Sequence, residues 1–230
     1  MNFTFGIITS PGSSGFLQQI VDIICDENIP EFEIIIVGGN EAHKNDVMQV
    51  IPFDESKKPM WITRKKNIIT ETAKYENVVY FHDYVTLVPG WYDGFKKFGN
   101  DFDICMTPIL NADGSRFRDW TIWISDDDPD RYNRGRLLPY TVTNLTKCMY
   151  ISGAYWVAKR AVMQRFPLDE RLSWGESEDV VWSRQVREHY NFSINTHSQA
   201  KLLKPKDPVF SAITPEKLKQ MQDYVNLQSQ

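Results

Sequence analysis

NVVYFHDYV, residues 77–85, is a run of apolar residues that ends in three polar side chains, His82, Asp83 and Tyr84. A continuous apolar run of this length is typical of a strand that is covered on both faces. Strands of that kind lie inside parallel sheets, with helices on each side. The stretch therefore predicts an interior strand of an α/β protein, with polar groups at its carboxyl end.

Two earlier segments have a similar pattern. Residues 3–9 favour a strand, and residues 33–37, EIIIV, are again almost continuously apolar. A helical pattern follows each of them, over residues 16–24 and about 65–74. Such strand–helix–strand units form right-handed crossovers, and their ligands bind beyond the carboxyl ends of the strands. We therefore predict one Rossmann-like α/β domain, in which helices flank a mainly parallel central sheet.

The second half of the chain is less regular. A further strand is expected over residues 102–109, and residues 111–146 have turn residues, mixed charge and little periodicity, which predicts a long surface loop. Beyond it, a helix is predicted in which Trp182 and Val186 share one face. A last helix is expected near the carboxyl end, with Thr214 as its N-cap and Pro215 at its first position.

Composition excludes several classes of function. The 230 residues include 26 Lys or Arg and 30 Asp or Glu, so the net charge is -4, and a nucleic-acid partner is not expected without a clustered basic surplus. The three cysteines are far apart and sit beside apolar sequence, which argues against disulfides and thiolate metal sites. No segment resembles a signal peptide or a transmembrane span, so we expect an intracellular, cytoplasmic protein.

Small residues follow the first two predicted strands. The first turn contains Thr9, Ser10 and Gly12, and the second strand ends at Gly38, two positions before Asn40. Backbone amides in such a turn, ahead of a helix, can bind phosphate or a ribose hydroxyl. A plain connecting turn is the competing interpretation, because the segment matches neither the phosphate loop nor the dinucleotide fingerprint.

Asp83 is a candidate metal ligand. A carboxylate at the end of an apolar interior strand is costly to bury unless it is paired or holds a cation such as Mg²⁺ or Mn²⁺. The alternative is an ordinary turn residue at a strand end. By strand alternation His82 should point the other way, which favours a hydrogen-bonded structural role for it.

A basic cluster, Arg64, Lys65 and Lys66, precedes Asn67 at the start of a predicted helix. Positive charge is unfavourable at that end of the helix dipole, so a compensating anion such as a diphosphate would explain the cluster. A solvated charged face is the alternative.

LSWGESEDVVW, residues 172–182, places Trp174 and Gly175 just before a predicted helix whose first turn carries Glu178 and Asp179. A carboxylate that accepts a proton, beside an aromatic platform and a tight turn, suits a site that deprotonates a sugar hydroxyl. Helix capping explains the same residues, because acidic side chains are favoured at a helix amino terminus.

Two tryptophans of the long loop, Trp120 and Trp123, also have two interpretations. An exposed indole can stack on a sugar face, whereas a buried indole anchors a loop. Nothing in the sequence decides between these roles.

Taken in order, these segments resemble the nucleotide-sugar glycosyltransferases of the GT-A fold, especially the inverting family-2 type, over residues 3–190. ITSPG at 8–12, Gly39 with Asn40, and KKN at 65–67 stand where that family has its first loop, its uracil-binding aspartate and an Ala-Arg-Asn-like helix start. FHDY at 81–84 stands at the Asp-x-Asp motif, with Asp83 as the one carboxylate. SGAYWVAKRAV at 152–162 and WGESED at 174–179 resemble the family's Gly-containing strand and its element for acceptor contacts and the catalytic base.

The resemblance implies transfer of a sugar from a nucleoside diphosphate donor, expected to be UDP-linked, to a hydroxyl of a glycan or glycosylated acceptor. Inversion and one Mn²⁺ or Mg²⁺ ion are expected. Residues 1–110 would bind the donor, 111–200 would bind the acceptor and carry catalysis, and 201–230 would form a helical extension of the same domain.

The resemblance also assigns individual roles. Asp179 becomes the base, with Glu178 as neighbour or substitute. The donor would contact Thr9, Ser10, Gly12, Gly38, Asn40, Arg64, Lys66, Asn67, His82, Asp83 and Tyr84. The acceptor would contact Trp120, Trp174 and Gly175, and the metal would bind Asp83 and His197.

Two other functions fit the same pattern. A sugar nucleotidyltransferase also uses a sheet, a metal and phosphate, but it should have a basic Gly-rich loop after the first strand, and SPGSSG at 10–15 contains no Lys or Arg. A non-catalytic carbohydrate-binding or scaffold domain would explain the reduced metal motif.

Overall fold

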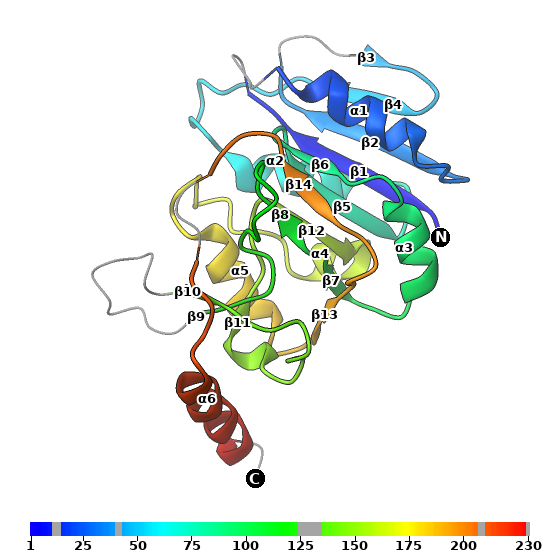
Figure 1. The fold of residues 1–230 in the computed structure, drawn as a ribbon. Helices are drawn as coiled ribbons and strands as arrows, with labels where there is room; N and C mark the ends of the chain where they lie inside the picture. The colour runs from blue at the N-terminus through cyan, green and yellow to red at the C-terminus, as the bar shows by residue number, and fades with distance from the viewer. Residues whose placement is uncertain (11–14, 40–42, 124–134, 207–209, 229–230) are drawn as a thin grey trace.

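The computed structural model describes residues 1–10, 15–39, 43–123, 135–206 and 210–228. Its centre is an eight-stranded sheet with the order β13-β7-β12-β5-β1-β2-β4-β3 (Figure 1). The strands are β1 (Phe3–Ile8), β2 (Phe32–Val37), β3 (His43–Lys44), β4 (Met48–Ile51), β5 (Asn77–His82), β7 (Ile104–Met106), β12 (Tyr155–Lys159) and β13 (Phe192–Ile194). Only β12 and β3 run antiparallel to their neighbours. The prediction of a mainly parallel α/β sheet is confirmed.

The apolar runs form strands because helices cover both faces of the sheet. Every residue of β1 and β5 is buried. On one face, Phe3 and Phe5 of β1 contact Trp91, which begins α3 (Trp91–Phe98). On the other face, Ile69 of α2 (Ile62–Thr72) fills the space above Gly6. Helix α1 (Leu17–Asp26) buries Ile20 and Ile24, and α4 (Arg160–Arg165) packs on α2 and β12.

Two small sheets extend the domain beyond the central one. They consist of β9 (Thr121–Trp123), β10 (Gly135–Leu137) and β11 (Met149–Tyr150), and of β6 (Val85–Leu87), β8 (Ile109–Leu110) and β14 (Ala200–Leu202). A 3-10 turn at Thr146–Cys148 precedes β11. Helix α5 (Glu178–Val186) packs against β11. The carboxyl ends of β1 and β5 point toward the side of the molecule where α5 lies (Figure 1).

The largest differences from the predicted elements lie at their ends. Helix α2 begins at Ile62 rather than Lys65, and no side chain caps its first turn, so the sequence gives no start marker there. The strand expected over 102–109 is divided into β7 and β8, because Pro108 between them has no N–H for a strand ladder.

The carboxyl-terminal helix α6 (Pro215–Gln228) begins as predicted, with the Lys217 N–H donating to Thr214 Oγ1 over 3.3 Å. It projects from the rest of the domain (Figure 1). Within the described parts of the chain, no helix has both the length and the apolar character needed to cross a membrane.

Candidate active site

The carboxyl ends of three parallel strands meet at one point. Thr9, after β1, donates from Oγ1 to Asp83 Oδ2, after β5, over 2.8 Å, and the Asp83 N–H donates to the Ile8 carbonyl over 3.2 Å. Gly38, after β2, has a φ of +136°, and a Cβ there would lie 2.2 Å from the Thr9 carbonyl oxygen. Only glycine allows this approach, because it lacks a Cβ and tolerates positive φ. The predicted convergence of the strand ends is confirmed.

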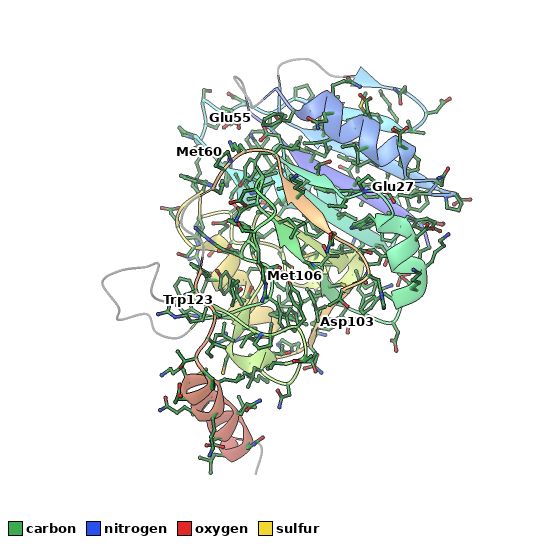
Figure 2. The ribbon with its side chains drawn as sticks, viewed as in Figure 1. Glu27, Glu55, Met60, Asp103, Met106 and Trp123 are labelled. Atoms are coloured by element: carbon green, nitrogen blue, oxygen red, sulfur yellow. The ribbon has the colours of Figure 1, made fainter. Side chains whose placement is uncertain are left out.

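Lys65 holds this junction together, although the sequence analysis gave it no role of its own. Its buried ammonium donates to the Thr9 carbonyl over 2.5 Å and to Ser10 Oγ over 2.9 Å, and forms an ion pair with Glu55. Ser10 Oγ donates to the same carboxylate over 2.7 Å. Glu55 lies on the side of the molecule toward which β1 and β5 end (Figures 1 and 2). A buried lysine is tolerable when its charge is paired and hydrogen-bonded.

Two of the three residues at the start of α2 that were predicted to contact the donor, Arg64 and Asn67, bind groups of the protein. Arg64 forms ion pairs with Glu71 at 2.6 Å and with Glu170 at 3.1 Å. Asn67 is buried, donates to the Leu168 carbonyl over 2.9 Å and accepts from the Leu168 N–H over 3.0 Å. Both side chains fasten α2 to residues 168–170. The structure contradicts a nucleotide contact for the buried Asn67, whereas the contact of the part-exposed Arg64 stays a prediction.

Lys66 lies beneath the site rather than on its surface. Its side chain is fully buried, donates to the Gly153 carbonyl over 2.8 Å and lies 4.6 Å from the centroid of the Trp156 ring. Burial lowers the pKa of Lys66 to about 8, against the opposing charges of Glu178 and Asp179. Lys66 is therefore an electrostatic partner of the two carboxylates, and the prediction of a direct donor contact is wrong for a group with no exposed surface.

Glu178 and Asp179 occupy the first turn of α5, as predicted. Asp179 Oδ2 accepts from the Gly153 N–H over 2.8 Å and Oδ1 from the Val180 N–H over 2.9 Å. Ser177 stands at the N-cap position in a left-handed conformation, but its side chain makes no capping hydrogen bond. The Ser177 side chain therefore does not cap α5, and the favourable placement of acidic groups at a helix amino terminus stays a second explanation of this turn.

Both carboxylates bind protons more tightly than usual. Burial and the neighbouring Asp179 charge raise the pKa of Glu178 to about 7. Burial also raises the pKa of Asp179, while the hydrogen bond from Gly153 and the charge of Lys66 act in the opposite direction. A carboxylate whose pKa approaches neutrality can accept a proton in a reaction near pH 7.

A pocket of about 410 Å³ brings α5 and the end of β5 together. Glu178 and Asp179 line it, and so do His82 and Tyr84. Burial, followed by the charges of Asp83, Glu178 and Asp179, raises the pKa of the Tyr84 phenol, so all three carboxylates lie near this ring. The predicted juxtaposition of Asp83 and Asp179 on one side of the molecule is confirmed.

At the end of β5, the side chains that face the pocket are an imidazole and a phenol. His82 and Tyr84 are buried and their rings lie 5.2 Å apart. Burial, together with the positive charges of Lys66 and Lys206, holds the pKa of His82 well below its usual value, so the imidazole is neutral. Asp83 points to Thr9, so the predicted opposite orientation of His82 and Asp83 is confirmed, with His82 on the pocket side.

Of the two loop tryptophans, the second reaches the pocket. Trp120 is fully buried and donates from Nε1 to the Val142 carbonyl over 2.7 Å, so the predicted acceptor contact is wrong and the anchor interpretation holds. Trp123, at the end of β9, lines the pocket and packs edge-on against Tyr150 at 5.4 Å (Figure 2). Residues three apart in an extended segment face opposite sides, which explains why Trp123 lines the pocket and Trp120 does not.

Trp174 and Gly175 lie at the pocket mouth, where the sequence placed them. Trp174 lines the pocket with 47% of its surface exposed, and its backbone N–H donates to the Met60 carbonyl over 3.1 Å. Gly175 has a φ of +86°, which makes the turn between Trp174 and α5 possible. Their contact with an acceptor stays a prediction.

Three basic residues that the sequence analysis did not single out surround the same pocket. Arg118 and Lys206 line it, and Lys204 lies 4.4 Å from the centroid of the Tyr84 ring. No motif marks them, because Arg118 and the two lysines are 86 residues or more apart in the chain. They come together only because β14 leads residues 204–206 back across the end of β5.

The described residues do not form the predicted metal site. Asp83 already accepts a hydrogen bond from Thr9, and the parts of the chain that the structure describes hold no group of three His, Cys, Asp or Glu able to bind a metal ion. Divalent cations of this class prefer several oxygen ligands. A single carboxylate that points to Thr9 rather than into the pocket does not fit a resident metal at this place.

His197 is not near Asp83, and this part of the metal prediction is wrong. Its carbonyl lies where a Cβ on Gly94 of α3 would be, 2.3 Å away, and the first turn of α3 donates to Glu27 at the end of α1. Because α1 runs back from the carboxyl ends of the strands, Glu27 lies toward their amino ends, on the opposite side from Glu55 (Figure 2). Two further donor predictions, Gly12 and Asn40, lie outside the described residues.

Comparison with models of protein families gives no match, and comparison with curated proteins gives none either. Solved structures do match. Residues 1–349 of TarS from S. aureus, in complex with UDP-GlcNAc, align with 99% of this chain at 12% identity and a TM-score of 0.62, over 66% of that structure. GalNAc-T7 with UDP, GalNAc and Mn²⁺ aligns with 94% of this chain at 11% identity and a TM-score of 0.63, over 46% of its own length.

At these identities the likeness concerns the fold alone. The chain spans 39% of the longer TarS structure. The α/β architecture with its mainly parallel sheet is therefore one that UDP-binding glycosyltransferases share, as the resemblance implied, whereas the family-2 assignment stays a prediction.

Proposed function

We propose that this protein transfers a sugar from a UDP-linked donor to a hydroxyl group of a glycan or glycosylated acceptor, with inversion at the anomeric carbon. The observation that carries the proposal is the pocket itself, in which the α5 carboxylates face His82 and Tyr84 at the end of β5. Ligands of parallel α/β sheets bind at that end of the strands. The shared fold with UDP-sugar enzymes supports the same reaction class.

In this proposal Asp179 is the base that removes the acceptor proton. Two backbone N–H groups, from Gly153 and Val180, fix its orientation, and its side chain is only half-buried, so an acceptor hydroxyl can reach it. Burial raises its proton affinity, and the positive charge of Lys66 lowers it. A base with an elevated pKa accepts a proton more readily while it remains ionised at neutral pH.

The donor and the acceptor then approach from different halves of the domain. The donor occupies the ends of β1, β2 and β5, contributed by residues 1–110. The acceptor lies between Trp123 and Trp174, whose indoles line the pocket in residues 111–200. With one base on the acceptor side, the hydroxyl attacks opposite the leaving diphosphate, and a single displacement of this kind inverts the anomeric carbon.

The direct test is release of free nucleoside diphosphate from a panel of UDP-, GDP- and dTDP-sugars with an acceptor panel. We expect release from a UDP-sugar, and Asp179→Asn should keep donor binding while it loses about a thousandfold or more in turnover. Glu178→Gln is the matched control and should remain active. Normal turnover by Asp179→Asn would overturn the assignment of the base.

A non-catalytic sugar-binding domain is the second candidate, and one observation favours it. The end of β5 has one carboxylate, Asp83, where the resembling enzymes have two, and the residues that line the pocket there are His82 and Tyr84. On that account nucleotides or glycans raise the melting temperature of the protein, but no sugar nucleotide in the panel is consumed. Turnover of any donor rules it out.

A further inference from the structure

The pocket has a cationic side that the proposed transfer reaction has not yet used. The ammonium groups of Lys204 and Lys206 each lie 4.4 Å from the centroid of the Tyr84 ring, and Lys206 also lies 5.5 Å from the Trp174 ring. Arg118 lines the same pocket, 4.7 Å from the ring of Phe210. Aromatic rings thus hold these cations in place on the side of the pocket next to the end of β5.

Among these three cations, Lys206 is the one whose positive charge is least offset by its surroundings. Within the described parts of the chain its ammonium makes no hydrogen bond and no ion pair. Burial, with the charges of Lys204 and Arg118, lowers the pKa of Lys206 to about 8, and the charge of Glu178 only partly offsets this. A half-buried cation among other cations is unfavourable until an anion binds to it.

The same region lacks what a metal-dependent donor site requires. The pocket-facing positions at the end of β5 are His82 and Tyr84, and the one carboxylate of that segment, Asp83, accepts a hydrogen bond from Thr9. The two carboxylates that line the pocket, Glu178 and Asp179, belong to α5, whereas Lys204, Lys206 and Arg118 lie around Tyr84 and Phe210. Phosphate oxygens bind Lys and Arg directly through charge-assisted hydrogen bonds.

We propose that Lys204 and Lys206, with Arg118, bind the diphosphate of the donor directly and supply the positive charge that a divalent ion supplies in metal-dependent enzymes. Donor binding and transfer then require no metal. The inference rests on the proposed function, and it specifies how that site recognises its donor.

The chemical step balances with these residues. The bond between the anomeric carbon and the β-phosphate oxygen breaks, and its electron pair stays on that oxygen, which Lys206 and Lys204 stabilise as its charge grows. The acceptor oxygen forms the new bond to the anomeric carbon, and its proton passes to Asp179. Nucleoside diphosphate and the glycosylated acceptor are the products.

The test is calorimetric titration of the whole protein with UDP, first in EDTA and then in Mn²⁺. We expect the same affinity in both, with a fall at higher salt. The double variant Lys204→Met/Lys206→Met should bind UDP about tenfold or more weakly, because two charge-assisted contacts are lost. Lys97→Met, on the exposed surface of α3, is the matched control and should leave the affinity unchanged.

Each result leads to a separate conclusion. UDP affinity that increases about tenfold or more with Mn²⁺, and loses this increase in Asp83→Asn, would overturn the inference and leave the proposed function in place. Unchanged UDP affinity in the double variant, with its circular dichroism spectrum intact, would overturn it as well. Absence of nucleotide binding under every condition would refute the proposed function itself.

Discussion

Gly153 lies where any side chain would disturb both carboxylates. A Cβ on this residue would lie 2.9 Å from Glu178 Oε1 and 3.2 Å from Asp179 Oδ2, and the Gly153 N–H and carbonyl bind Asp179 and Lys66. The backbone at this position thus connects the base to the buried cation. Its importance follows from contacts with residues that are far away in the sequence.

We therefore expect Gly153→Ala to reduce transfer about a hundredfold, because a displacement of about 1 Å at the reacting groups has effects of that size. UDP affinity should change little, since Gly153 hydrogen-bonds Asp179 and Lys66 rather than the cations proposed to bind the diphosphate. Steady-state kinetics and UDP titration measure the two quantities. Full activity in this variant would show that the carboxylate positions are not critical.

The pH profile separates the roles of Glu178 and Asp179. Burial, the Gly153 hydrogen bond and the Lys66 charge set the pKa of Asp179, and Glu178, whose pKa is about 7, is still protonated at lower pH where Asp179 ionises. The acidic limb of the rate profile should therefore keep its position in Glu178→Gln if Asp179 is the base. A limb that moves to lower pH in this variant would mean that Glu178 is the titrating group.

At the residue scale, the sequence identified the carboxylate pair and missed the cations. Glu178 and Asp179 are adjacent in the chain and begin a helix, so their local pattern was sufficient. Lys206 and Arg118 are 88 positions apart and become neighbours only through tertiary structure. Asn67 was misassigned, because a helix start does not reveal which loop it supports.

Among the elements, helix α5 contains a buried carboxylate, Glu178, whose negative charge lowers the stability of the folded protein. The pKa of Glu178 is about 7 in the folded protein and 4.5 is the ordinary value. Between these values the folded state keeps a proton that the unfolded state releases, so stability falls as the pH rises through this interval. Glu178→Gln removes the penalty.

The melting temperature of Glu178→Gln should accordingly exceed that of the wild-type protein above pH 7, by about 2–4 °C if the gain is 1 kcal/mol. Below pH 4.5 the two should be similar, since the wild-type carboxyl is then protonated. Scanning calorimetry at the two pH values is the measurement. A variant that is less stable at the higher pH would contradict a net penalty for the buried charge.

Helix α2 is tied to the segment before α5 through Asn67. Its side-chain amide bonds both the N–H and the carbonyl of Leu168, so Asn67→Ala leaves two backbone groups without partners. We expect a loss of about 1–3 kcal/mol in unfolding free energy with unchanged UDP affinity. Urea unfolding and UDP titration test this. A large loss of affinity in a folded variant would restore the nucleotide contact.

For the whole molecule, the apolar runs were sufficient to predict the fold class. Strands β1, β2 and β5 are the three segments that the sequence indicated, and they are adjacent in the sheet. The short strands of the two small sheets have two or three residues each, too few for a periodic pattern. The helix starts and the division of β7 from β8 needed coordinates.

The most direct test of the central claim is a crystal structure of the protein with UDP bound. The account predicts the nucleoside at the ends of β1 and β2, and the diphosphate beside Lys206 and Tyr84. The carboxylates of Glu178 and Asp179 should face the diphosphate across a space large enough for one sugar. UDP bound away from the ends of these strands, or Asp179 closed off from the diphosphate, would contradict the account.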